Sequence, residues 1–156
     1  MVRMEVSVTF EKVEAERLLE PAELVRVTGE RIEVNTRVDS VELKQRPSRP
    51  DFNVVIKFVF TCRYPASIGL IRLTGQAFYS DAAETMKVAV ETWQKSRRLP
   101  ESIEPAVLNT IMGRATLEAI SLSRILQIPP PIPLPGVPTN PPQRRKPGKA
   151  DFSHYV

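Results

Sequence analysis

Apolar and polar residues alternate regularly along the first part of the chain. From Val2 to Phe10 every second residue is apolar, which is the period of a strand with one buried face. The same alternation covers Arg31–Gln45, but its apolar phase slips by one residue after Asp39. A slip of this kind predicts one long strand with a β-bulge. The segment Val13–Leu24 between these strands fits either a continued strand or a short helical turn.

The strongest strand pattern is Phe52–Arg63, written FNVVIKFVFTCR. Its second face mixes apolar and polar residues. Pro65 favours a tight reversal, after which Ile68–Ser80 alternates again, so we expect one long hairpin. The apolar face of the first strand consists of Phe52, Val54, Ile56, Phe58, Phe60 and Cys62.

After Ser80 the apolar period changes to that of helices. Asp81, with Glu84 three residues later, predicts a capping box at the start of the first helix. The second helix is expected over Pro105–Gln127 and runs into the proline segment Ile128–Pro135. The stripe predicted for the first helix is Ala82, Met86, Ala89, Val90 and Trp93. The stripe predicted for the second is Leu108, Ile111, Met112, Ala115, Ala119, Leu122 and Leu126.

Strands followed by two helices indicate an α+β fold, in which about four antiparallel strands are covered on one face by two C-terminal helices. Residues 1–135 are expected to form a single domain. Residues 136–156, rich in proline and basic side chains, are expected to form a flexible tail.

Composition narrows the class of protein. With 156 residues, 42% hydrophobic and 26% charged, the chain is typical of one soluble globular domain. No apolar run approaches the ~20 residues of a membrane-spanning helix, so we expect a cytoplasmic protein without membrane insertion. The net charge of +4 owes much to four tail residues, Arg144, Arg145, Lys146 and Lys149.

The sequence offers no catalytic chemistry. His154 is the only histidine and lies close to the C-terminus, while Cys62, the only cysteine, continues the apolar face of a strand. A thiol nucleophile needs a base beside it, and one cysteine cannot form an intramolecular disulfide or a cysteine-based zinc site. We therefore expect no catalytic residue, metal or cofactor, and predict that the protein is not an enzyme.

Two features point to binding instead. The strand faces and helix stripes hold more apolar surface than one sheet and its helices need, which favours an oligomer interface or a ligand groove. The tail reads PTNPPQR from Pro138 to Arg144, a PxxP pattern followed by arginine, which fits either a polyproline ligand or a stiff linker. An alternative function is therefore a nucleic-acid or ribonucleoprotein factor that uses Arg144, Arg145, Lys146 and Lys149 on an oligomeric body.

The order of segments from about residue 52 to 135 resembles the SecB family of export chaperones. Phe52–Arg63 looks like the second strand of that family, and Ala77–Ser80 looks like its Gly-Ile-Phe-Ser step. Glu104–Leu108 with Arg114–Ile120 is similar to the P-x-x-L…A-R-x-x-I helix, and Leu126–Leu134 is similar to the exit segment. The order and spacing carry the resemblance, since no motif is specific alone.

The resemblance implies an ATP-independent holdase, a homo-oligomer (dimer or tetramer) that binds non-native or partner polypeptide in apolar grooves. Three departures bear on coupling to a secretion motor: the chain is basic, Lys95–Glu104 lengthens the helix pair, and the N-terminal strand and tail have no counterpart. The residues expected to bind peptide are Val54, Ile56, Phe58, Phe60, Phe78, Trp93, Ile128 and Ile132.

Overall fold

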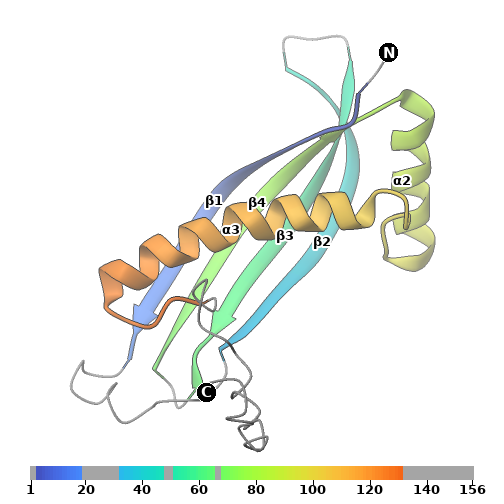
Figure 1. Ribbon diagram of the computed structural model, residues 1–156. Coiled ribbons are helices and arrows are strands. Elements are labelled where there is room, and N and C mark those ends of the chain that lie inside the picture. Colours follow the sequence, from blue (N-terminus) through green and yellow to red (C-terminus); the bar gives the residue numbers. More distant parts are fainter. Residues whose placement is uncertain (1–2, 19–31, 48–50, 66–67, 132–156) are drawn as a thin grey trace, which may run out of the picture.

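A computed structural model describes residues 3–18, 32–47, 51–65 and 68–131. Its strands and helices form the α+β arrangement expected from the sequence, a four-stranded antiparallel sheet with two helices (Figure 1). The elements in chain order are β1 (Glu5–Arg17), β2 (Glu33–Gln45), β3 (Phe52–Arg63), β4 (Gly69–Ser80), α2 (Ala83–Ser96) and α3 (Glu104–Leu126).

The strands lie in the order β1-β4-β3-β2. Consecutive strands β2, β3 and β4 are neighbours, while β1 lies beside β4 at the far edge, which is a Greek-key arrangement. The long hairpin predicted over Phe52–Ser80 is confirmed, and it forms the centre of the sheet. The edges are therefore β1 and β2.

Both edge strands contain an irregularity in register. In β2 the pairing with β3 shifts between Val38 and Ser40, which confirms the bulge predicted at Asp39. In β1 the pairing with β4 shifts between Phe10 and Lys12, and the strand continues to Arg17. The strand alternative for this region is therefore correct as far as Arg17, and residues 19–24 of that segment lie outside the described residues.

Gly75 allows β1 and β4 to approach closely beneath two aromatic rings. It pairs with Phe10 on one side and Phe58 on the other. These rings meet edge to face, with centroids 6.1 Å apart and an interplanar angle of 81°. A Cβ at position 75 would lie 2.3 Å from the Thr9 carbonyl oxygen and 2.9 Å from the Phe58 ring. Only glycine fits this position without a shift of the neighbouring strand.

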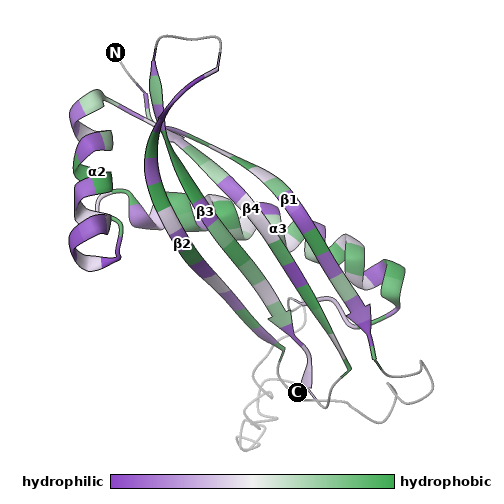
Figure 2. Cartoon of the chain, turned by 180° about the vertical axis from the view of Figure 1, so that it is seen from behind, coloured by the Kyte–Doolittle hydropathy of each residue, from purple (hydrophilic) through white to green (hydrophobic). Residues whose placement is uncertain are grey.

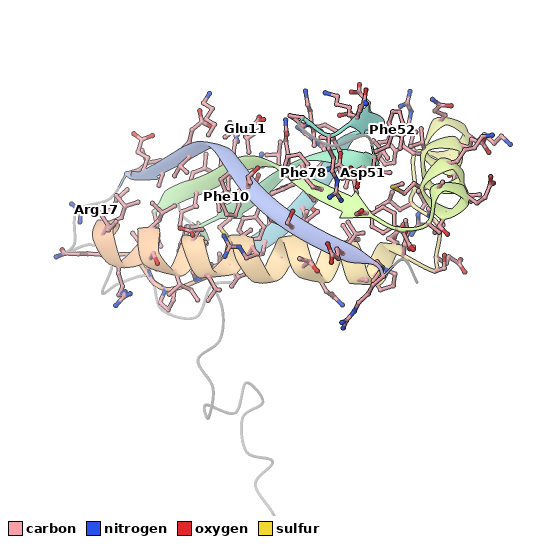
Figure 3. The ribbon with its side chains drawn as sticks, turned by 90° about the horizontal axis from the view of Figure 1, so that it is seen from above. Phe10, Glu11, Arg17, Asp51, Phe52 and Phe78 are labelled. Atoms are coloured by element: carbon pink, nitrogen blue, oxygen red, sulfur yellow. The ribbon has the colours of Figure 1, made fainter. Side chains whose placement is uncertain are left out.

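The two helices cover one face of the sheet, as predicted. In Figure 1 α3 runs obliquely across the sheet; it packs mainly on β1, β4 and β3, whereas α2 packs against β2 and β3. Figure 3 shows α3 on one side of the sheet and Phe10 directed toward it, while Glu11 leaves β1 on the other side. Phe10 packs against the core, and Glu11 is exposed.

The buried line of α3 differs from the predicted stripe. Residues four apart are buried, namely Val107, Ile111, Ala115, Ala119 and Ser123. This line drifts around the helix by about 40° per turn because four residues exceed one turn of 3.6, so that Leu108 is only partly buried and Met112 is 39% exposed. The prediction that Met112 faces the core is wrong for this reason.

The predicted capping box is also wrong. Ala82 is the N-cap of α2 and has no side-chain cap hydrogen bond. Asp81 instead accepts hydrogen bonds from the Tyr79 hydroxyl at 2.7 Å and from the Ala82 backbone N–H at 2.8 Å. Burial and this neighbouring carboxylate raise the pKa of Tyr79 above its ordinary value. Asp81 therefore ties the start of α2 to the end of β4.

Candidate functional site

The structure places most of the predicted peptide-binding residues in the core. Val54, Ile56, Phe58 and Phe60 are fully buried on the helix-covered face of β3. In one chain these side chains stabilise the fold and offer no surface to a polypeptide. Ile128 is 6% exposed, and Ile132 lies outside the described residues, as do the basic residues Arg144, Arg145, Lys146 and Lys149.

Phe78 and Trp93 line two separate hollows of the surface. Phe78 is partly buried on the open face of the sheet, where it lines a hollow of about 710 Å³ with Arg46 and Ser80. Trp93 lines a hollow of about 300 Å³ on the helix-covered face, beside β2. The predicted residues therefore do not converge on one site.

Figure 2 views the sheet from its open face, with α3 behind the strands, and polar and apolar residues alternate along each strand. A hollow of about 520 Å³ there is lined by Arg37, Arg63 and Arg72 among others. Two of these guanidinium groups already have carboxylate partners, because Arg37 lies 2.7 Å from Asp39 and Arg72 lies 3.4 Å from Glu14. The open face is consequently balanced in charge at this point.

The hollow beside β2 combines apolar walls with a free strand edge, and we call it the α3–β2 groove. Thr36 and Val38 from β2 form one wall, and the N-terminal part of α3 contributes Leu108. Trp93 at the end of α2 and Leu99 in the following loop close one end. The groove lies between β2 and the start of α3, because α3 packs mainly on β1, β4 and β3.

A buried hydroxyl group in the groove has no hydrogen-bond partner. The Oγ1 atom of Thr36 is inaccessible and unpaired among the described residues. An unsatisfied buried polar group costs about 1–3 kcal/mol, and Thr36 carries that cost in the wall of the groove. Val34, two residues along the same strand face, is 36% exposed and extends the apolar wall.

Charged residues form the rim of the groove. Arg97 has a left-handed backbone (φ 57°) at the C-cap of α2, and its guanidinium carbon lies 6.0 Å from the centre of the Trp93 ring. Arg98 pairs with Glu104 at 3.2 Å. The lining combines apolar side chains from Val38, Trp93, Leu99 and Leu108 with the charged residues Arg37, Arg97, Arg98 and Glu104, so the groove has apolar walls and a charged rim.

The sequence predicted Trp93 as a binding residue, but it did not predict that Thr36, Leu99 and Leu108 line the same groove. Thr36 carried the best signal, since it is the one polar residue in the apolar phase between Val34 and Val38. No group of three or more metal-ligating side chains occurs in the part of the chain that the structure describes. In the same part, no helix has the length and apolar character needed to span a membrane.

Comparisons with protein-family models, curated proteins and solved structures find no match to this chain.

Proposed function

We propose that the protein is a SecB-like, ATP-independent polypeptide-binding protein that holds an extended segment of a non-native or partner chain in the α3–β2 groove. The observation that carries this proposal is the groove itself. Its apolar walls lie beside the first half of an edge strand and enclose the unpaired Thr36 hydroxyl.

An extended chain suits this site for two physical reasons. The outer side of β2 has no strand partner among the described residues, and an edge strand can add a peptide strand through backbone hydrogen bonds. Every second side chain of that peptide would then face Val34, Thr36 and Val38. Such contacts are tolerant of sequence, because backbone groups are common to all polypeptides.

The free energy that the groove can contribute favours weak and reversible binding. Burying one large aliphatic or aromatic side chain contributes about 1.5–3 kcal/mol, so two such side chains contribute roughly 3–6 kcal/mol before the cost of ordering the bound chain. Before that cost, these free energies correspond to dissociation constants from roughly several millimolar to tens of micromolar. A homo-oligomer would strengthen the binding of long chains by presenting several grooves at once.

Exposed apolar residues support the proposal of a homo-oligomer. Leu117 and Ile125 are 62% and 76% exposed on the side of α3 that faces away from the sheet. They are eight residues apart and share one face of the helix, which makes this face a candidate contact for a second copy.

Cytoplasmic localisation remains a prediction.

The test measures aggregation of an unfolded client protein in the absence of ATP. The wild-type chain should suppress aggregation, and Leu108→Asp should abolish most of the suppression because the substitution places a charge in the groove. Val88→Asp is the matched control, since it places the same charge on an exposed position of α2 (49% exposed) that lines neither the groove nor the proposed oligomer contact. If wild type leaves aggregation unchanged at stoichiometric excess, or if Leu108→Asp suppresses it as well as wild type, the proposal fails.

A further inference from the structure

The segment that follows α3 is tied to the ends of β1 and β3. The Leu126 carbonyl accepts a hydrogen bond from Arg17 Nη1 at 3.1 Å, and the Pro129 carbonyl accepts one from the Tyr64 hydroxyl at 2.6 Å. Ile128 and Pro131 are buried. In Figure 1 this segment leaves the end of α3 near β1 and turns back toward β3.

The register of the sheet sets the distance from this anchor to the groove. Thr36 pairs with Phe60, four residues before Tyr64. At about 3.3 Å per residue, this separation is roughly 13 Å along β3. A polyproline II segment advances about 3.1 Å per residue, so roughly four residues directed along β3 from Pro129 would span this separation, and one strand spacing of about 4.8 Å separates β3 from β2. Ile132 and Leu134 are within that reach.

The residues at this point of the chain suit an apolar groove with an aromatic end. The sequence from residue 132 reads Ile-Pro-Leu-Pro, which alternates large apolar side chains with prolines. Proline fixes φ near −65° and removes a backbone donor, so little conformational entropy is lost on docking. Grooves lined by aromatic residues recognise such segments, and Trp93 supplies the aromatic side chain here.

We propose that Ile132 and Leu134 of the same chain dock in the α3–β2 groove and must leave before another polypeptide binds there. The competition with another polypeptide rests on the proposed function. Docking of the segment is measured separately, through the fluorescence of Trp93. A short tether gives an effective concentration of about 1 mM. An intrinsic dissociation constant on the order of 0.1 mM then weakens the affinity for a second polypeptide by about tenfold.

The experiment uses the full-length chain with Ile132→Asp and Leu134→Asp combined. Trp93 is the only tryptophan, so its emission reports the groove directly. The probe is a reduced, carboxymethylated polypeptide that lacks tryptophan. We expect a red shift of Trp93 emission in the free variant and about tenfold tighter probe binding than in wild type. The control combines Thr139→Asp and Ala150→Asp, which add the same charge farther along the tail.

Each outcome decides one of the two proposals. A shift of Trp93 emission in the groove-directed variant, absent from the control, supports docking even if neither protein binds the probe, in which case the polypeptide-binding function fails. Unchanged emission together with unchanged probe affinity overturns docking and leaves the function intact. Equal effects in both variants also overturn docking, because they would reflect charge alone.

Discussion

Gly75→Ala tests the packing that holds β1 on the sheet. A Cβ at this position would lie 2.3 Å from the Thr9 carbonyl oxygen and 3.2 Å from the Phe10 Cα. Real Cβ contacts essentially never fall under 3.0 Å, so β1 must move back by at least 0.7 Å, the difference of the two values. A shift of that size takes backbone hydrogen bonds of ~2.9 Å beyond their usual limit.

The effect of Gly75→Ala on the free energy of unfolding is the sum of three contributions. Loss of one or two backbone hydrogen bonds costs about 1–2 kcal/mol, and separation of the Phe10–Phe58 pair costs about 0.5–1.5 kcal/mol. Alanine recovers about 0.5–1 kcal/mol through the reduced entropy of the unfolded chain. We therefore expect Gly75→Ala to lower the free energy of unfolding by roughly 0.5–3 kcal/mol.

Urea unfolding followed by Trp93 fluorescence and by circular dichroism measures this change. Gly113→Ala is the matched control, because a Cβ at Gly113 meets nothing within 4 Å and alanine is the better helix former. The control should raise the free energy of unfolding by about 0.5–1 kcal/mol. If Gly75→Ala were neutral or stabilising, β1 could not lie against β4 in the register described.

Two further predictions concern the end of β3. Burial raises the pKa of the Cys62 thiol to about 12, so alkylation by iodoacetamide at about pH 8 should proceed only as fast as the chain unfolds; rapid labelling of the native protein would contradict this. Because the native thiol holds its proton more tightly than the unfolded one, stability should fall as pH rises from about 9 toward 12, and Cys62→Ala should lessen that fall. Tyr64→Phe removes the hydrogen bond to the Pro129 carbonyl and should lower the free energy of unfolding by about 1 kcal/mol, measured by urea titration; an unchanged midpoint would mean that the segment after α3 is not held there.

Local patterns in the sequence predicted most of the secondary structure. The phase slip at Asp39 identified the bulge of β2, and the alternation over Phe52–Ser80 identified the central hairpin. Each signal depends on residues close together in the chain. The strand order β1-β4-β3-β2 was not predictable in this way, because it depends on which distant edges pair.

The candidate site was harder to predict for a related reason. Alternation shows that Val54, Ile56, Phe58 and Phe60 share one face, but it does not show that the helices cover that face completely. The groove lies where the coverage by α3 ends, and that boundary is set by the crossing of α3 over the sheet. Thr36 was visible as a polar residue in an apolar phase, yet its isolation from other polar groups appears only in three dimensions.

Amide hydrogen exchange of the protein bound to an unfolded polypeptide tests the central proposal most directly. The free edge of β2 lies beside the groove, so exchange should slow on binding over Glu33–Val38 and over the first turns of α3. Amides of β1, at the opposite edge of the sheet, should be unaffected and serve as the internal reference. Formation of a complex with unchanged exchange over Glu33–Val38 would contradict binding at the α3–β2 groove.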